Sequence, residues 1–270
     1  MKMRVIAALV LIPVLLVVLF VAPPIFVSVV AGLVCAIGVY ELLVGTGFVK
    51  NFRLIAYTAV AAFCVPIWCC AGSVHLWGSL GVFLYVGLLF SELLISKGKQ
   101  RFERLAVCIA GGLIIPYLLS ALIRILGDGT NRMMILIPFI LAYMSDTGAF
   151  FIGCTWGRHK LAPTISPKKS VEGLVGGVLF AVLGMMLYCL ILNLGFKVQV
   201  NYLYAVTYGI LGSFAGTFGD LCFSAIKRQA GIKDYGNLIP GHGGILDRVD
   251  SLIIVAPLVE ILLAMLPILE

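Results

Sequence analysis

Residues 220–250 carry a dense set of charged and polar side chains in a chain that is otherwise almost entirely hydrophobic. Four of the 12 acidic residues and four of the 19 basic residues fall in this stretch. An ionisable group costs roughly 2.5–3.5 kcal/mol at the centre of a membrane helix. A hydrophobic chain therefore keeps such a cluster where water or a charged ligand meets it. Carboxylates beside cations and glycines suit metal and phosphate chemistry, so we look for the function here.

The first group in this stretch is Asp220, Ser224 and Lys227. The spacing i, i+4, i+7 places all three on one face of a helix. A carboxylate one turn from a hydroxyl and two turns from an ammonium suits a hydrated divalent cation with a phosphate beside it. The simpler alternative is a helix that emerges into the cytoplasm, with Asp220 paired to Lys227.

A glycine-rich loop follows at 240–244, with His242 in the middle. Its backbone can approach a ligand closely and present N–H groups to phosphate oxygens. Asp247 and Asp250 come next, on either side of Arg248, and could cap a helix and complement its dipole. Two aspartates directly after a glycine loop favour metal or phosphate chemistry over capping alone. His242 could be a general base, a phosphate donor or a packing residue, and the sequence leaves these alternatives open.

A second polar segment is expected to begin at Asp146, near the cytoplasmic end of a hydrophobic segment at 132–152. It includes the run Ser166-Pro-Lys-Lys-Ser170 ahead of a predicted helix at 173–195. Cations and hydroxyls near a helix N-terminus form a natural anion site. A solvated basic loop is the alternative interpretation.

The elements that must position these residues are membrane helices. The chain is 62% hydrophobic and 11% charged, with a mean hydropathy of +1.14, whereas soluble domains are about 25% charged. Since a membrane span needs about 20 apolar residues, we predict nine spans, at 5–22, 25–44, 54–72, 75–96, 105–126, 132–152, 173–195, 201–222 and 251–269. The prediction is an all-α integral membrane protein with one polytopic domain over 1–270. Residues 1–104 would anchor it and 105–270 would carry the chemistry, with Glu41 and Glu92 at solvated helix ends.

The basic residues predict the orientation. With the N-terminus in the cytoplasm, nine spans place 16 of the 19 basic residues on the cytoplasmic side, as the positive-inside rule requires. Both polar segments then face the cytoplasm. The net charge of +7 is therefore one-sided, which suits anionic lipid headgroups or a polyphosphate rather than nucleic acid.

The polar residues also form a recognisable pattern. The positions Ser224-x-x-Lys227-Arg228, Lys233-Asp234 and Pro240-x-His242-Gly243-Gly244-x-x-Asp247-Arg248-x-Asp250 resemble the signature of the phosphatidate cytidylyltransferase (CDP-diacylglycerol synthase) family. The runs Asp146-Thr-Gly-Ala-Phe-Phe and Ser166-Pro-Lys-Lys-Ser170-x-Glu172-Gly173 are similar to the second motif region of that family.

This resemblance implies an enzyme of phospholipid biosynthesis. Such an enzyme transfers CMP from CTP to phosphatidic acid, which yields CDP-diacylglycerol and pyrophosphate. The family resemblance also implies a multi-pass protein of the bacterial inner membrane, dependence on Mg²⁺, a second, monovalent cation such as K⁺, and a homodimer.

On this basis we predict roles for individual residues. Asp220 and Asp247 are predicted to hold the metal, with Asp250 and Asp146 as further candidates. The residues predicted to be catalytic are Asp220, Lys227, Asp247 and His242. The candidates for substrate binding are Ser224, Arg228, Lys233, Gly243, Gly244 and Arg248, with Lys168, Lys169 and Ser170 assigned to the lipid phosphate.

Two other functions remain in competition at this point. A CTP-dependent kinase of lipid alcohols would also set metal and phosphate groups at the membrane interface. A transporter of anions would use basic residues and broken helices, but its polar groups should lie near the bilayer midplane. The loop-borne position of the cluster argues against the transporter. The run from Lys227-Arg228 to His242-Gly243-Gly244-x-x-Asp247-Arg248 favours the cytidylyltransferase over the kinase.

Overall fold

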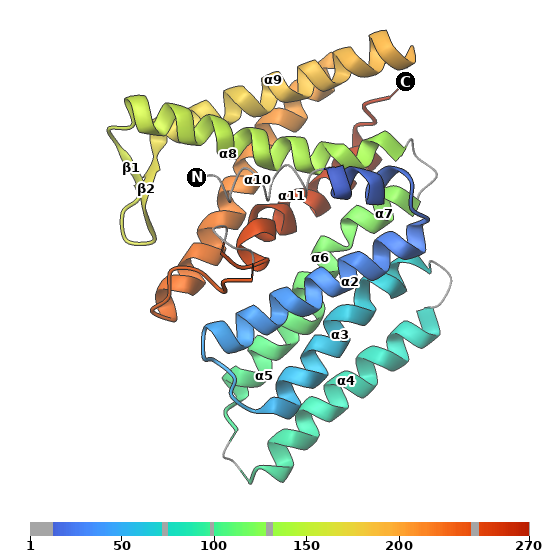
Figure 1. Cartoon of the computed structure of the whole chain (residues 1–270), viewed down its shortest axis with the longest axis vertical. Coiled ribbons are helices and arrows are strands. Elements are labelled where there is room, and N and C mark those ends of the chain that lie inside the picture. Colours follow the sequence, from blue (N-terminus) through green and yellow to red (C-terminus); the bar gives the residue numbers. More distant parts are fainter. Residues whose placement is uncertain (1–12, 72–74, 98–99, 128–131, 239–242, 270) are drawn as a thin grey trace. The chain divides into compact units, whose positions relative to one another are not determined.

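The computed structural model describes residues 13–71, 75–97, 100–127, 132–238 and 243–269, and most of them are helical (Figure 1). The chain forms two compact units. Unit 1 comprises Met1–Arg132 and Gln229–Val249, and unit 2 comprises Met133–Arg228 and Asp250–Glu270.

Unit 1 contains α2 (Pro24–Tyr40), the π-helix η1 (Glu41–Gly45), α3 (Phe52–Cys70), α4 (His75–Ile95), α5 (Phe102–Ile109), the π-helix η2 (Ala110–Ile114), α6 (Ile115–Leu119) and α7 (Ala121–Gly127). A 3₁₀ turn, η3 (Arg132–Ile135), leads into unit 2. Unit 2 contains α8 (Leu136–Trp156), the strands β1 (Lys160–Ala162) and β2 (Ser166–Ser170), α9 (Val171–Phe196) and most of α10 (Tyr202–Gln229) and α11 (Leu246–Met265).

Seven helices among the described residues are long and apolar enough to cross a membrane. They are Pro24–Gly45, Phe52–Cys70, Leu76–Ile95, Phe102–Gly127, Arg132–Trp156, Val171–Phe196 and Tyr202–Gln229. These correspond to the second to eighth predicted spans, and they confirm the all-α membrane class. The first predicted span lies partly outside the described residues, and the last falls on the charged helix α11. The count of nine and the orientation stay predictions.

The span predicted at 105–126 is interrupted in the structure. The helix changes from α5 to the π-helix η2, to α6 and to α7. Pro116 lies in α6 and has no N–H to donate to the preceding turn, and two adjacent glycines lie in η2. The Ser120 hydroxyl donates to the Pro116 carbonyl at 2.6 Å, and the Tyr85 hydroxyl donates to the Cys108 carbonyl at 2.8 Å. Side-chain hydroxyls therefore donate hydrogen bonds to backbone carbonyls where the regular α-helix is interrupted.

In unit 1, α2 packs along α3, and α4 lies on the other side of α3 (Figure 1). A Cβ atom built on Gly32 of α2 would lie 2.5 Å from the Phe63 carbonyl oxygen of α3, so this close approach requires glycine. Glu92 of α4 is buried, and one of its carboxylate oxygens lies 3.3 Å from an Arg53 guanidinium nitrogen. The prediction of a solvated Glu92 was wrong, because the carboxylate is buried with a charged partner from α3.

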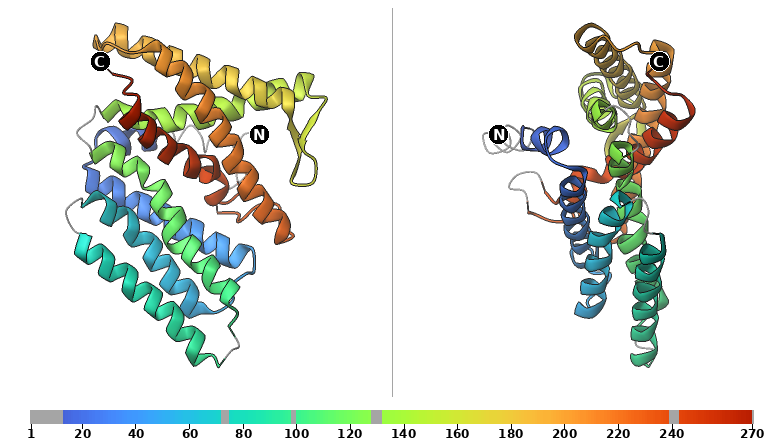
Figure 2. Two further views of the ribbon diagram at one scale, coloured as in Figure 1. Left: turned by 180° about the vertical axis from the view of Figure 1, so that it is seen from behind. Right: turned by 90° about the vertical axis from the view of Figure 1, so that its right-hand side faces the viewer.

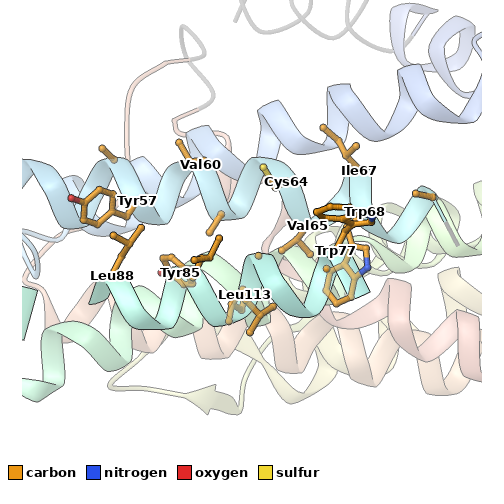
Figure 3. A pocket seen from close by; sticks show the side chains of 17 residues that line it. Tyr57, Val60, Cys64, Val65, Ile67, Trp68, Trp77, Tyr85, Leu88 and Leu113 are labelled. Carbon is orange, nitrogen blue, oxygen red and sulfur yellow. The ribbon is translucent and has the colours of Figure 1, made fainter. Parts of the chain in front are cut away.

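An apolar pocket of about 740 Å³ lies between α3 and α4. Figure 3 shows Tyr57 and Trp68 of α3, Trp77 and Tyr85 of α4, and Leu113 of η2 among the side chains that line it. None of the described residues that were predicted for catalysis or substrate binding lines this pocket. It is therefore separate from the predicted phosphate chemistry.

In unit 2, α8 and α9 lie side by side over much of their length (Figure 1). A Cβ atom on Gly148 would lie 2.5 Å from the Gly176 carbonyl oxygen, so this pair of helices approaches backbone to backbone. The buried hydroxyls of Ser145 on α8 and Ser213 on α10 lie 2.7 Å apart. Small residues and one interhelical hydrogen bond thus hold three helices together.

The loop predicted to start at Asp146 starts instead at Gly157, because α8 continues for ten residues beyond Asp146. The glycines after Asp146 do not end the helix, since Gly148 and Gly153 pack closely on α9. The remaining segment is not a plain loop either. It forms a two-stranded antiparallel hairpin, in which Lys160 pairs with Ser170 and Ala162 with Ser166. The hairpin extends from the end of the α8–α9 pair (Figure 2).

Candidate functional site

The polar residues of unit 2 meet around Asp220 on α10. The Lys169 ammonium lies 2.7 Å from the Oδ2 atom of Asp220, and the Ser224 hydroxyl donates to its Oδ1 atom at 3.1 Å. The helical face predicted from the spacing of Asp220 and Ser224 is therefore present. Lys169 comes from β2, so the ion pair joins the second polar segment to the first, a pairing that the spacing alone did not predict.

Lys227 and Asp250 are the buried charges of this cluster, each with 8% of its surface exposed. Burial raises the pKa of Asp250, the Asp220 carboxylate raises it further, and the Asp146 carboxylate adds a smaller effect in the same direction. The backbone N–H of Ser251 and the Lys227 ammonium lower the pKa of Asp250, which nevertheless rises to about 7. The carboxylates of Asp146 on α8 and Asp220 on α10 thus act electrostatically on Asp250 of α11.

The hairpin is fixed to both of its neighbouring helices. The Arg228 Nε atom at the end of α10 donates to the Ile165 carbonyl at 3.1 Å. The Ser170 hydroxyl caps α9 by accepting the Gly173 N–H at 3.1 Å, which is the usual task of a serine at this position. In this structure Arg228 and Ser170 therefore order the hairpin, whereas Lys168 is exposed on β2.

The Glu172 carboxylate holds the chain between α8 and β1. It accepts the N–H groups of Arg158 at 3.1 Å and His159 at 3.2 Å, and it lies 2.6 Å from the Nδ1 atom of His159. Glu172 belongs to the first turn of α9, where a negative charge complements the helix dipole. The glutamate of the second motif region therefore has a structural role in positioning the hairpin.

In unit 1, Asp247 ties the preceding loop to the start of α11. Its Oδ2 atom accepts the N–H groups of Tyr235 at 2.9 Å and Gly244 at 3.2 Å. The Gly244 N–H, which the sequence suggested for a substrate phosphate, is bonded to this carboxylate. Gly243 has φ of +82°, the left-handed backbone region that favours glycine. The loop glycines therefore serve the geometry of the turn.

Glu41 of η1 is a residue that the sequence interpretation missed. Only 6% of its surface is exposed, and its two carboxylate oxygens accept the N–H groups of Ile245 at 3.1 Å and Leu246 at 2.9 Å. The prediction of a solvated Glu41 was wrong, because its carboxylate is buried against the start of α11. Ionisable residues inside hydrophobic segments usually face the protein interior and have partners, and that rule could have identified Glu41.

The other predicted residues lie in different places. Lys233 and Arg248 are exposed, and His242 lies outside the described residues. Asp247 belongs to unit 1 and Asp220 to unit 2. Their joint binding of one metal ion stays a prediction from the sequence.

The carboxylates of unit 2 are the candidate ligands for the Mg²⁺ that the family resemblance implies. Among the described residues, no group of three or more His, Cys, Asp or Glu side chains is arranged to hold a metal ion. Mg²⁺ needs fewer protein ligands, because it takes one or two carboxylates and completes its shell with water and phosphate oxygens. Asp220 and Asp250 supply two carboxylates on helices that approach closely beside them, since a Cβ atom built on Gly219 would lie 2.9 Å from the Asp250 carbonyl oxygen.

Comparison with known proteins supports the family resemblance that the sequence pattern indicated. The chain is 37% identical over 176 residues to the phosphatidate cytidylyltransferase of Staphylococcus saprophyticus and 36% identical over 176 residues to that of Staphylococcus haemolyticus. It is 36% identical over 179 residues to the phosphatidate cytidylyltransferase of Staphylococcus aureus. In each case the match covers 65% of this chain and 65% of the relative's length. The cytidylyltransferase family matches residues 2–266, almost the whole chain. This protein therefore belongs to the cytidylyltransferase family.

Proposed function

We propose that this protein transfers CMP from CTP to phosphatidic acid, forming CDP-diacylglycerol and pyrophosphate in phospholipid biosynthesis. The observation that carries the proposal is the cluster of Lys169, Asp220 and Ser224. It unites residues of the two polar segments that resemble the phosphatidate cytidylyltransferases. The names of the relatives, which are 36–37% identical, support the same reaction.

The chemistry requires positioning and charge neutralisation rather than a strong base. A phosphate oxygen of phosphatidic acid, already anionic at neutral pH, attacks the α-phosphorus of CTP. The bond between the α-phosphorus and the oxygen that bridges it to the β-phosphate breaks, and pyrophosphate leaves with that electron pair. Such transfers depend on in-line placement and on stabilising charge at the transferred group. Lys227 and Arg228 carry cationic charge on the last turns of α10, close to the hairpin.

The residues that would hold Mg²⁺ in unit 2 are Asp220 and Asp250, with Asp146 close enough to influence Asp250 electrostatically. Bound Mg²⁺ would supply charge neutralisation for the triphosphate and for the pyrophosphate that leaves. Asp247 remains a predicted ligand on the strength of the sequence pattern. Binding of K⁺ and a homodimer are proposals that rest on the family resemblance.

The membrane setting fits a reaction between a lipid and a soluble nucleotide. The relatives are bacterial, and seven of the described helices could cross a membrane. We place the polar segments on the cytoplasmic face of the bacterial inner membrane because the basic residues favour that side. There, phosphatidic acid in the bilayer and CTP in the cytoplasm can both reach the site.

The test is an acceptor-resolved assay on the full chain in detergent. Purified protein is incubated with Mg²⁺ and CTP labelled at either the α- or the γ-phosphate, together with phosphatidic acid, diacylglycerol or polyprenol. Labelled CDP-lipid formed from α-labelled CTP with phosphatidic acid alone, and lost with EDTA, is the expected result. Transfer of the γ-phosphate to an alcohol would replace the proposal with a lipid-alcohol kinase. No transfer to any acceptor, with anion flux in proteoliposomes, would indicate a transporter.

A further inference from the structure

The start of α11 is capped by a carboxylate from a distant part of the chain. Leu246 is the first residue of α11, and its N–H group and that of Ile245 have no acceptor within the helix itself. Both donate to Glu41, one to each carboxylate oxygen, across sequence separations of 204 and 205 residues. A negative charge at this end also complements the positive pole of the helix. All these residues belong to unit 1.

The glycines around this contact leave room for the Glu41 carboxylate. A Cβ atom built on Gly244 would lie 2.5 Å from the Oε2 atom of Glu41, and one built on Gly236 would lie 2.6 Å from its Oε1 atom. These separations are shorter than any ordinary contact of a Cβ atom. Gly244 belongs to the glycine-rich loop, so Glu41 explains why a side chain is excluded at this position.

Asp247 is the second carboxylate that accepts backbone N–H groups at the start of α11. It lies one residue after Leu246, and its Oδ2 atom accepts the N–H groups of Tyr235 and Gly244. Three consecutive N–H groups, those of residues 244–246, therefore donate to the two carboxylates. The direction of the first turn of α11 depends on both, and Arg248 extends from that same turn.

We propose that Glu41 is a positioning residue for nucleotide binding, acting through the backbone of residues 244–246 on Asp247 and Arg248. This inference rests on the proposed transfer of CMP from CTP. Glu41 does not touch the substrates in this proposal. It fixes the turn from which Asp247 and Arg248 extend, so its loss should weaken the use of CTP and leave the use of the lipid unchanged.

The first experiment compares Glu41→Gln with the wild-type protein in detergent. Gln keeps the size of the side chain and one oxygen acceptor, but it replaces the other oxygen with an NH₂ donor. We expect the KM for CTP to rise at least about fivefold and the KM for phosphatidic acid to stay within about twofold. We also expect hydrogen exchange at Ile245 and Leu246 to accelerate about tenfold. A purely structural role would reduce the amount of active protein and leave both KM values unchanged.

Glu92→Gln is the matched control, because Glu92 is equally buried, lies in the same unit and pairs with Arg53 instead of a backbone. It should leave the KM for CTP and the exchange of residues 243–249 unchanged. If Glu41→Gln does not fold, Glu41→Asp replaces it, since the shorter carboxylate cannot reach both N–H groups.

A second experiment measures the contact itself by a double-mutant cycle. Gly244→Ala should accelerate exchange at Ile245 and Leu246 about tenfold when Glu41 is present, and less than about twofold in a Glu41→Ala background, where the space is free. Gly87→Ala, which adds a methyl group facing open space on α4, should have no effect in either background.

The outcomes are distinguishable. If the wild-type protein forms no CDP-lipid, the proposed function fails, while the exchange measurements still test Glu41. An unchanged KM for CTP in Glu41→Gln overturns the positioning role. Additive effects of Gly244→Ala and Glu41→Ala on exchange at residues 245 and 246 would overturn the role even without any catalytic assay.

Discussion

The ammonium of Lys169 lies 2.7 Å from the carboxylate of Asp220 and 3.5 Å from the Thr217 carbonyl oxygen, so β2 contacts two successive turns of α10. Both side chains of the ion pair are partly exposed. Ion pairs of this kind add only about 0–1 kcal/mol to the free energy of unfolding. The contact therefore matters for the placement of charge around Asp220 more than for the stability of the fold.

Lys169→Met should reduce activity while leaving the fold intact. The substitution removes the cation beside Asp220 but keeps an unbranched side chain of similar length. We expect kcat/KM for phosphatidic acid to fall by at least about tenfold and the melting temperature to change by no more than about 2–4 °C. Steady-state kinetics and thermal unfolding in detergent measure the two effects on one preparation.

Lys168→Met is the control on the same strand, because Lys168 is exposed. It should raise the KM for phosphatidic acid, in line with the predicted contact to the lipid phosphate, and leave kcat near the wild-type value. Equal losses of kcat in the two variants would contradict a specific role for the Lys169–Asp220 pair.

Asp220 and Asp247 should respond differently to alanine. Asp220→Ala is expected to abolish turnover with little change in stability, since Asp220 pairs with a partly exposed lysine. Asp247→Ala should abolish turnover and also destabilise the protein, because the N–H groups of Tyr235 and Gly244 lose their acceptor. An unsatisfied buried donor costs about 1–3 kcal/mol.

Asp247→Asn separates the two effects, because the amide oxygen can still accept these N–H groups. We expect a melting temperature close to that of the wild-type protein and a loss of turnover, measured by thermal unfolding and by formation of CDP-lipid. An active Asp247→Ala or Asp247→Asn protein would show that Asp247 is needed for structure alone.

The pKa of Asp250 predicts how stability depends on pH without metal. Asp250 is the fifth residue of α11, ahead of the predicted span at 251–269, and its pKa rises from 3.8 to about 7 on folding. The folded protein therefore binds this proton more tightly than the unfolded chain. Its contribution to stability is complete below pH 3.8 and is lost as the pH rises through about 7.

Thermal unfolding in EDTA from about pH 4 to about pH 8, a range that covers the loss of this contribution, measures the effect. The melting temperature of the wild-type protein should fall more steeply with rising pH than that of Asp250→Asn, which has no titrating carboxyl at this position. Parallel curves for the two proteins would show that Asp250 titrates in the same way in the folded and unfolded states.

Close packing of α8 on α9 predicts a strong effect of adding one methyl group. Gly148→Ala would place its Cβ atom 2.5 Å from both the Gly176 carbonyl oxygen and the Phe180 Cβ atom. Overpacking of this kind costs about 1–3 kcal/mol, so the melting temperature should fall clearly. Gly195→Ala on α9 is the control, since its Cβ atom would face open space. Equal melting temperatures for the two variants would contradict the close approach of the helices.

The membrane helices could be predicted because the length of each apolar segment can be read from the sequence alone. Seven predicted spans correspond to observed helices, with ends that differ by at most seven residues. The start of the second polar segment at Asp146 was placed too early, because α8 continues to Trp156 and its glycines Gly148 and Gly153 pack on α9. The hairpin was missed for a related reason, since β1 and β2 are short and are held by Arg228 and Glu172 from outside the strands.

The candidate site was predicted in its composition but not in its pairings. Spacing placed Asp220 and Ser224 on one helical face, and in the structure the Ser224 hydroxyl donates a hydrogen bond to the Asp220 carboxylate. No spacing rule connects Lys169 with Asp220 or Glu41 with Ile245, because these pairs form only when segments distant in the sequence pack together. The two glutamates in early spans were interpreted as solvated because their partners could not be identified from local sequence.

The separation of Glu41 from its partners also affects how the chain is made. A ribosome adds about 5–20 residues per second, so Glu41 precedes Ile245, 204 residues later, by roughly 10–40 s. During that interval the carboxylate lacks the two N–H donors that it has in the finished protein. The early helices can therefore enter the membrane in order, but unit 1 reaches its final hydrogen bonding only after the last helix begins to emerge. A chain that stops before Ile245 keeps the Glu41 carboxylate without either of those donors.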